Sequence, residues 1–416
     1  MDNPRNTTIL RDMGTSQHIA IVGGGLAGPL LAIALADAGF SVTIVDSRAE
    51  KIRRNAAFDG RSYALALTSC RLLRKLDLWQ ALAKHAEPIL QIKVSEGRAG
   101  TGPGPFWLGF DHAEIEEGPM GHMIQDRHLR RALLDGISAR DRITHIAGVE
   151  VIGQQAAPGA IRVDLASGAT LDAAVLVGAD GRESGTARRA GIKRMAWGYD
   201  QTALVAAIEH ENPHHGIAHQ FFMPPGPLAL LPLPQNRCSI VWSEQRATAK
   251  AFLALSKADF MTVLRPRFGS FLGEIKLVGK RWSYPLGLSV AQEIVAERVA
   301  LVADAAHGVH PLAGQGLNAG IRDIAALAQT LSEAAARGED IGSAGVLARY
   351  QEWRRFDNSA LAFATDGFNR LFSNDNPALR GLRSLGLGMV NRLPRARRGF
   401  IREAAGLTGE LPNLMR

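Results

Sequence analysis

Cysteine is scarce in this sequence: Cys70 and Cys238 are the only two among 416 residues, and they lie far apart. No Cys-x-x-Cys pair or Cys/His cluster occurs, so the sequence favours neither a zinc site nor an iron–sulfur site. Two isolated thiols form no disulfide framework, which favours a reducing compartment such as the cytoplasm. We expect both thiols to be buried and structural.

Long hydrophobic runs are also missing. The best candidate, residues 26–40, is interrupted by Asp37 and Gly39, so no segment is typical of a membrane-spanning helix. Residues 1–16 are polar, mixed in charge and without the apolar stretch of a secretory signal, and we expect a frayed leader there. Neither a low-complexity tract nor a fixed repeat occurs, and the length favours two closely packed domains.

Positive charge is concentrated near the C-terminus. Between residues 377 and 416, eight arginines stand against two glutamates, a net charge of +6 out of +8 for the whole chain. A nearly neutral remainder does not favour nucleic acid as a partner. The same segment carries apolar residues, Leu382, Leu385, Leu387, Met389, Val390 and Leu393. This combination predicts peripheral contact with an anionic membrane, on its inner face, or with a partner protein; a solvated arginine-rich helix is the alternative.

A glycine-rich turn follows the first predicted strand. Residues 18–22 are apolar and β-branched, and Gly23-Gly24-Gly25-Leu26-Ala27-Gly28 leads from them into a helical pattern that runs to Phe40. Residues 41–45 predict a second strand that ends in Asp46, about 20 residues beyond the glycines. This strand–turn–helix–strand unit predicts a dinucleotide-binding domain.

Each position in this motif has a mechanical reason. Gly23 permits the tight turn, Gly25 lets backbone N–H groups approach a pyrophosphate, and Gly28 lets the helix pack closely on the strand. The helix N-terminus attracts the anion. Asp46 would accept hydrogen bonds from an adenosine ribose. The motif alone does not decide between NAD and FAD.

A second motif follows a predicted buried strand at residues 171–177. Residues 178–184, which include Asp180, form an acidic turn that opens another helix, and an ordinary strand-to-helix turn is the alternative.

A third motif is more specific. Residues 298–304 predict a strand that ends at Asp304, and a glycine-rich loop that starts at His310 then leads into a helix. Consecutive N–H groups in such a loop can bind a pyrophosphate or the electron-rich edge of a flavin, while Asp304 can accept from ribityl hydroxyls.

The three motifs, in this order, resemble those of FAD monooxygenases of the para-hydroxybenzoate hydroxylase type, and specifically the ubiquinone-biosynthesis hydroxylases, over nearly the full chain. Residues 310–323 match the ubiquinone-hydroxylase signature at every fixed position. Two positions depart from the family pattern: Ala303 stands where relatives usually have glycine, and Asp46 where glutamate is usual. The alanine adds one methyl group near the cofactor, but neither change removes a required group.

The resemblance implies which residues contact FAD: Gly23, Gly25, Leu26, Ala27, Gly28, Asp46, Arg61, Arg127, Asp180, Asp304, Pro311, Gly314, Gly316, Leu317 and Asn318. Arg61 and Arg127 are assigned by the resemblance alone. Without it, both would be interpreted as solvated surface charges.

The resemblance also implies an α/β fold, with a Rossmann-like FAD-binding domain, an inserted antiparallel β-sheet substrate domain and a C-terminal helical region. Strand-like runs at residues 201–209, 217–223, 228–232 and 237–243 predict the antiparallel sheet. We expect residues 17–75, 101–190 and 285–345 in the discontinuous FAD-binding domain, 76–100 and 191–284 in the substrate domain, and 346–416 in the helical region with its basic tail.

In the family, such a sheet covers the flavin and forms the substrate pocket. We expect Phe222 and Leu230 from the sheet, and His310 and Pro311 from the third motif, to face that pocket. For any single sheet residue, plain packing in the core is the alternative. His307 and His310 do not predict a metal site, because no third ligand lies nearby in the sequence.

The activity implied is that of an FAD-dependent aromatic-ring monooxygenase, which uses NAD(P)H and O2, through a flavin hydroperoxide, to hydroxylate a polyprenylated phenol in ubiquinone biosynthesis. The motifs contain no catalytic triad, metal cluster or paired carboxylates, so the flavin should carry the chemistry. The alternatives are another flavoprotein of this fold, such as an epoxidase, a prenyl reductase or a halogenase, and a non-catalytic flavin-binding subunit of a biosynthetic complex. The tryptophan-rich motif typical of a halogenase is absent from the sequence.

Overall fold

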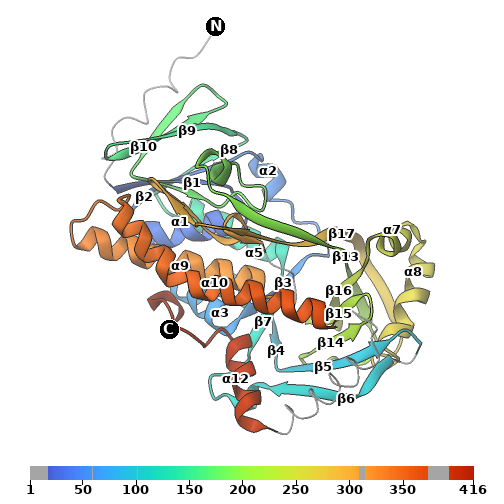
Figure 1. The fold of residues 1–416 in the computed structure, drawn as a ribbon. Coiled ribbons are helices and arrows are strands. Elements are labelled where there is room, and N and C mark those ends of the chain that lie inside the picture. The colour runs from blue at the N-terminus through green and yellow to red at the C-terminus, as the bar shows by residue number, and fades with distance from the viewer. Residues whose placement is uncertain (1–16, 59, 101, 309–313, 373–392) are drawn as a thin grey trace.

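Two β-sheets lying side by side organise the chain (Figure 1). The structure is a computed structural model that describes residues 17–58, 60–100, 102–308, 314–372 and 393–416. A six-stranded sheet belongs to the half of the molecule that contains the N-terminal glycine turn, and an eight-stranded sheet belongs to the other half.

The six-stranded sheet is parallel except for one edge strand. Its order is β18 (Val295–Ala296), β19 (Val299–Leu301), β12 (Val175–Gly178), β1 (His18–Val22), β2 (Ser41–Asp46) and β8 (Ile143–Ala147). Only β18 pairs in the antiparallel sense. The central strands are buried on both faces, which explains why their sequences are continuous apolar runs rather than alternating patterns.

Helices cover one face of this sheet and a small sheet covers the other (Figure 1). The helices are α1 (Ala27–Asp37), α5 (Asp126–Ser138), α9 (Gln315–Ala336) and α10 (Ala344–Phe372), and the small sheet contains β9 (Val151–Ala157), β10 (Ala160–Leu165) and β11 (Thr170–Ala173). Residues 28–36 of α1 are all buried, because the helix packs against the sheet, α5 and α9 at once.

The strand expected at residues 171–177 is instead two strands in two different sheets. The strand β11 pairs within the small sheet and β12 within the parallel sheet, with Ala174 between them. Because both strands are buried, the apolar run continues across the break and its pattern could not reveal the division.

The eight-stranded sheet contains all four strands expected from the runs between residues 201 and 243. Its order is β20 (His307–Gly308), β17 (Ile275–Ala291), β13 (Arg194–His210), β16 (Arg237–Gln245), β15 (Gly226–Leu233), β14 (Ile217–Met223), β5 (Gln91–Arg98) and β6 (Gly102–Asp111). It is antiparallel except for the β14–β5 pair. The helices α7 (Arg246–Ala254) and α8 (Lys257–Leu264) and the short helix η4 (Arg265–Arg267) accompany it.

Two of the expected domain boundaries fall inside this sheet. The boundary at residues 100/101 separates the paired strands β5 and β6, and the boundary at 284/285 cuts β17. Residues 102–111 and 285–291, which were expected in the FAD-binding domain, therefore belong to the eight-stranded sheet. A hairpin partner and the second half of a long strand carry no compositional boundary that a sequence could show.

The remaining elements are smaller. They are α2 (Glu50–Arg53), α3 (Leu67–Lys75), α4 (Trp79–Ala83), α6 (Gly185–Arg189), the short helices η3 (His112–Glu114) and η5 (Ala303–Ala305), and a three-stranded sheet of β3 (Ser62–Ala66), β7 (Gly121–Gln125) and β4 (Glu87–Ile89). Both cysteines are buried and free, as expected. Burial raises the pKa of each thiol, Cys70 and Cys238, to about 12.

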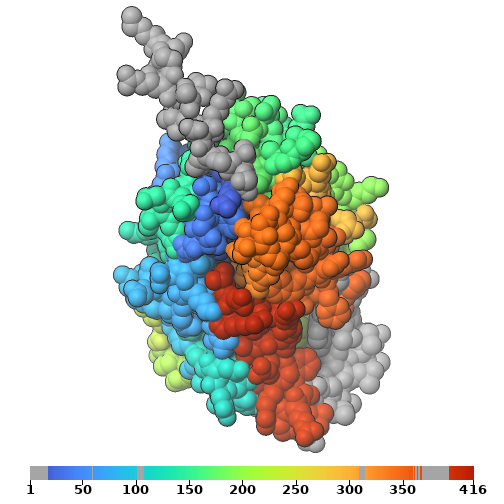
Figure 2. Space-filling view, turned by 90° about the vertical axis from the view of Figure 1, so that its left-hand side faces the viewer, coloured from blue at the N-terminus to red at the C-terminus, as the bar shows by residue number. Residues whose placement is uncertain are grey.

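The C-terminal segment packs into the molecule. It forms α12 (Pro394–Ala404) and the short helix η7 (Asn413–Met415), and Ile401, Ala405 and Met415 are buried. Arg397 pairs with Glu114 at 2.8 Å. Figure 2 shows this segment, in red, against parts of the chain coloured blue, cyan and orange. Among the described residues, no helix is both long enough and apolar enough to cross a membrane.

Candidate active site

The glycine turn after β1 has the geometry that its motif predicts. Gly23 has φ +113°, and a Cβ there would lie 2.4 Å from the carbonyl oxygen of Ala179. A Cβ on Gly28 would lie 1.9 Å from the carbonyl oxygen of Gly23. By contrast, among the residues that the structure describes, and its own chain neighbours aside, no atom lies within 4 Å of the position that a Cβ on Gly25 would take. Gly23 and Gly28 are thus required by the fold, whereas Gly25 faces open space.

Asp46 lies at the end of β2, next to this turn. A Cβ on Gly24 would lie 2.2 Å from Asp46 Oδ2, so the carboxylate occupies the space that this glycine leaves. Arg53 donates through Nε to Oδ2 at 2.7 Å and through Nη2 to Oδ1 at 2.9 Å. Burial alone would raise the pKa of Asp46, but the hydrogen bonds from Arg53 and from the Arg48 N–H hold this pKa below its usual value.

The second motif lies directly behind the first, because Gly23 approaches Ala179 and Asp180. The Asp180 carboxylate accepts hydrogen bonds from Ser184 Oγ at 2.5 Å and from Thr186 N and Oγ1 at 2.9 Å. Its side chain therefore holds the start of α6 in place.

The third motif places Asp304 in η5, directly after β19. The Asp304 side chain is half exposed, and its Oδ2 lies 3.7 Å from Arg182 Nε. Gly314, with φ +65°, precedes α9, so the helix that contains Gly316 and Leu317 starts from a left-handed residue. His310 and Pro311 lie outside the described residues.

Asn318 connects α9 to β3 and α3. Its Oδ1 accepts from Ala66 N and Ser69 Oγ, both at 2.8 Å, and its Nδ2 donates to the carbonyl oxygens of Ala64 at 2.8 Å and Gly314 at 3.1 Å. All four hydrogen-bonding positions of the amide are used within the chain. The side chain thus positions the start of α9.

A cavity of about 390 Å³ opens beside the glycine turn. It is lined by Gly25, Leu26, Arg48, Ile52, Arg53, Asn55, Ala57, Phe58, Arg61, Tyr63, Asp126, Arg130, Lys280 and Trp282. Lys280 and Trp282 come from β17, so both halves of the molecule contribute to its wall. Five cationic side chains stand against the one carboxylate of Asp126, which suits a ligand with two phosphates.

The two arginines assigned by resemblance have different positions. Arg61 lines the cavity and donates to Asp126 Oδ2 at 3.1 Å. Arg127 does not line it: its guanidinium donates to Gln125 Oε1 at 2.8 Å and lies over the Phe58 ring. From the same segment, the structure brings Asp126 and Arg130 to the cavity, with Arg130 Nε 2.7 Å from Asp126 Oδ2.

Several lining residues were not found by sequence reasoning. Arg53 lies seven positions beyond Asp46, and a basic residue at that distance belongs to no general motif. Lys280 and Trp282 lie more than 200 residues from the glycine turn. Lys280 and Trp282 reach the cavity because β17 runs beside it.

The expected pocket residues Leu230 and Phe222 lie on opposite faces of the eight-stranded sheet. Leu230 is buried with Trp242 and Phe260 beneath α8, which corresponds to the alternative of plain packing in the core. Phe222 lies on the other face, beside Leu108. Successive side chains of a strand alternate between faces, and the uniformly apolar sequence of β15 does not reveal which of them point into the core.

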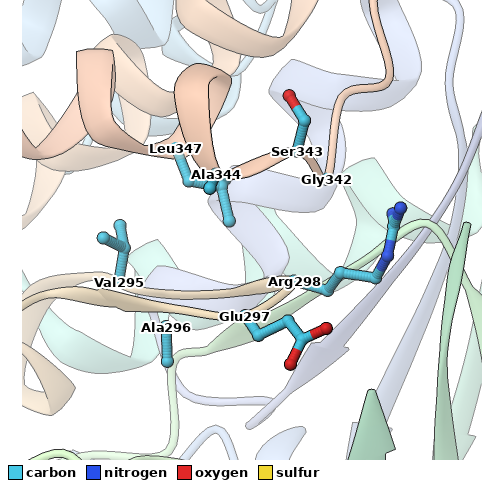
Figure 3. A pocket seen from close by; sticks show the side chains of 8 residues that line it. All are labelled: Val295, Ala296, Glu297, Arg298, Gly342, Ser343, Ala344 and Leu347. Carbon is cyan, nitrogen blue, oxygen red and sulfur yellow. The ribbon is translucent and has the colours of Figure 1, made fainter. Parts of the chain in front are cut away.

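A second cavity, of about 430 Å³, lies between the β18–β19 hairpin and the start of α10 (Figure 3). It is lined by Val295, Ala296, Glu297, Arg298, Gly342, Ser343, Ala344 and Leu347. None of these residues is a predicted FAD contact. Arg298 donates to Asp340 and to the Ala174 carbonyl oxygen. This cavity shares no lining residue with the cavity beside the glycine turn, so the two are separate.

A family model described as an FAD binding domain matches residues 16–362, which is most of the chain. The structure has the same fold as the p-nitrophenol 4-monooxygenase PnpA from Pseudomonas putida DLL-E4, with a TM-score of 0.77, 19% identity, and coverage of 96% of this chain and 100% of that one. At this identity the similarity shows the fold alone. The glycine turn, the cation-lined cavity and the family match together define an FAD-binding flavoprotein.

Two relatives narrow this class. The chain is 42% identical to the ubiquinone hydroxylase UbiL of Rhodospirillum rubrum over 401 residues, covering 96% of this chain and 92% of the relative. It is 33% identical to the 3-demethoxyubiquinol 3-hydroxylase of Escherichia coli over 392 residues, covering 94% and 98%. The chain therefore belongs to the FAD-dependent monooxygenase family of ubiquinone-biosynthesis hydroxylases.

Proposed function

We propose that this enzyme hydroxylates the aromatic ring of a polyprenylated phenol on the path to ubiquinone, with NAD(P)H as the electron donor and O2 as the oxidant. One oxygen atom enters the ring, the other leaves as water, and NAD(P)H supplies the two electrons. The names of the relatives support this substrate class. The observation that carries the proposal is the cation-rich cavity, whose wall joins the glycine turn to the eight-stranded sheet.

When bound, FAD supplies the redox chemistry, and the protein binds and orients the reactants. The N–H groups at the start of α1, next to Gly25, would hold the pyrophosphate. Asp46 would accept from the adenosine ribose and Asp304 from the ribityl chain. The backbone at Gly314, Gly316 and Leu317 would donate N–H groups to the charge on the reduced flavin.

The eight-stranded sheet would exclude water from the reacting ring. Trp282 lines the cavity, and Tyr284 lies two residues further along β17, on the same face of the sheet. A tyrosine hydroxyl is protonated at neutral pH, and partial burial raises the pKa of Tyr284 further, so this hydroxyl can donate a hydrogen bond. Phe222 lies on this face as well, and we propose it as an apolar contact of the substrate.

The experiment is a balance of reactants and products. The purified, FAD-loaded protein is given NADPH and a prenylated phenol, and oxygen uptake, hydrogen peroxide and product mass are measured together. We expect one O2 consumed per added oxygen atom. Oxygen uptake without an oxygenated product, or a product changed in its prenyl chain, would refute the ring hydroxylation. Flavin that stays oxidised with NADPH and NADH alike would instead favour a protein electron donor or a non-catalytic subunit.

We further propose that α12 contacts an anionic membrane surface, from which a prenylated substrate could be delivered. Leu393 and Phe400 are 54% and 45% exposed, and Arg395 and Arg398 are exposed beside them. Apolar and cationic side chains together favour the headgroup region of an anionic bilayer.

A further inference from the structure

Asp323 is a fully buried carboxylate in α9 that forms hydrogen bonds to two other segments, the turn at residues 303–307 and α10. Its Oδ2 accepts from the backbone N–H of Ala303 at 3.0 Å and from His307 Nε2 at 2.5 Å. Its Oδ1 accepts from Arg354 Nε, in α10, at 2.8 Å. Asp323 thus joins α9 and α10 to the turn that contains Asp304.

This carboxylate is charged at neutral pH. Burial alone would raise the pKa of Asp323, but His307 and Arg354 hold this pKa at about 2. A buried anion with donors on both oxygens has a defined orientation, because each donor must be satisfied at the same time. The Asp323 side chain therefore fixes where the Ala303 N–H can lie.

The turn that Asp323 binds is strained. Ala303 has φ +54°, a left-handed conformation that costs energy for any residue with a Cβ. Helix α9 leaves room for the Ala303 methyl group at Gly320. A Cβ on Gly320 would lie only 2.6 Å from the Ala303 Cβ. Gly320 and Asp323 are three residues apart and lie on one face of the helix. One face of α9 thus provides both the space and the acceptor for Ala303.

We propose that Asp323 is a positioning residue for the flavin: through the Ala303 N–H it holds the left-handed turn that places Asp304 against the cofactor. The inference rests on the proposed contact between Asp304 and FAD. Asp323 does not touch the cofactor in this scheme, and its effect passes through the backbone of residues 303 and 304. A glycine at position 303 would adopt the same turn without strain, so the dependence on Asp323 is a property of a chain with alanine there.

The test measures FAD affinity in three variants. We expect Asp323→Asn to raise the dissociation constant for FAD at least tenfold and to change the visible circular dichroism of the bound flavin. Adding Ala303→Gly should recover a large part of this affinity, because the turn then needs less support. The control is Asp357→Asn, which removes another carboxylate bound to Arg354, at 2.6 Å, but no contact with the turn. Its FAD affinity should stay within twofold of the wild type.

A second pair of variants avoids the buried charge, in case Asp323→Asn does not fold. Gly320→Ala should push the Ala303 methyl group and weaken FAD binding, and Ala303→Gly should reverse this effect. If the folded Asp323→Asn and Gly320→Ala proteins bind FAD with wild-type affinity and an unchanged spectrum, the inference is wrong. Asp304→Ala distinguishes failure of the proposed Asp304–FAD contact from failure of the positioning role of Asp323. If Asp304→Ala leaves FAD affinity unchanged, the contact between Asp304 and FAD is wrong.

Discussion

Arg53 binds the carboxylate of Asp46 through two hydrogen bonds, one to each oxygen, and so connects α2 to the end of β2. Both side chains are more than four-fifths buried, at 18% and 2% exposure. Asp46 lies against Gly24, and Arg53 lines the wall of the cavity together with Gly25. The acid that the first motif assigns to the ribose is therefore held in a fixed position by an arginine that the motif does not contain.

Removing this arginine should change how the protein tolerates acid. The pKa of Asp46 is lowered in the folded state, so the pair stabilises the fold above the usual aspartate pKa of about 4, and this stability is lost as pH falls through the lowered value. In Arg53→Met the pKa of Asp46 should rise, so the variant should be less stable than the wild type near pH 7, and this difference should shrink as pH falls and Asp46 becomes protonated. Melting temperatures measured between about pH 3 and pH 7 test this.

The matched control for Arg53 is Arg54→Met. Arg54 pairs with Glu50 at 2.5 Å, but both side chains are well exposed, so this pair contributes little to stability. Equal acid sensitivity of the two variants would contradict a special role for the buried pair.

The glycine turn gives a second pair of variants with opposite expected results. Gly25→Val adds a side chain into open space, so the apoprotein should fold while FAD is no longer retained. Gly28→Val places a Cβ against the Gly23 carbonyl oxygen and should destabilise the fold itself. Flavin content and the melting temperature of the apoprotein separate the two outcomes. A yellow Gly25→Val protein would show that the pyrophosphate lies elsewhere.

The local part of the site could be predicted from the sequence, because it is encoded by short motifs. The glycine turn, Asp46 and the start of α9 all lie where strand, turn and helix patterns place them. What could not be predicted depends on tertiary contacts. The sheet residues Lys280 and Trp282 reach the cavity only because β17 crosses beside the FAD-binding half.

The sequence also did not show which face of the sheet each side chain of a strand occupies. The strand β15 reads Gly-Pro-Leu-Ala-Leu-Leu-Pro-Leu, and an uninterrupted apolar run assigns no face to any single residue. The structure assigns Leu230 to the core beneath α8 by its contacts with Trp242 and Phe260. The break between β11 and β12 was hidden for the same reason, since both strands are buried.

Because Leu230 and Phe222 lie on opposite faces of the sheet, we expect different effects when each side chain is shortened to alanine. Leu230→Ala should cost about 2 to 5 kcal/mol of unfolding free energy, because it leaves a cavity in a packed core. Phe222→Ala, on the half-buried face, should cost less and should instead increase hydrogen peroxide released per NADPH, as the substrate loses an apolar contact. Denaturant unfolding and the oxygen balance measure the two effects. The assignment fails if Leu230→Ala leaves stability unchanged and uncouples the reaction.

The position of the C-terminal segment determines how the proposed membrane contact must be tested. Deleting residues 393–416 would remove the buried side chains Ile401, Ala405 and Met415, and with them the ion pair between Arg397 and Glu114. We expect that deletion to destabilise the protein, so weaker membrane binding by a truncated chain would not identify a docking surface.

Replacing both Arg395 and Arg398 by Gln avoids this problem, because both side chains are exposed. Each arginine near an anionic surface contributes about 1 kcal/mol, so the double variant should bind phosphatidylserine vesicles more than tenfold more weakly at low salt. The difference should shrink as salt rises, since screening weakens both proteins toward the same apolar contribution. The control is Lys250→Gln with Lys257→Gln, an equal charge change at exposed positions on α7 and α8. Equal losses in the two double variants would mean that net charge alone drives binding, and wild-type binding by the arginine variant at every salt concentration would rule out α12 as the contact.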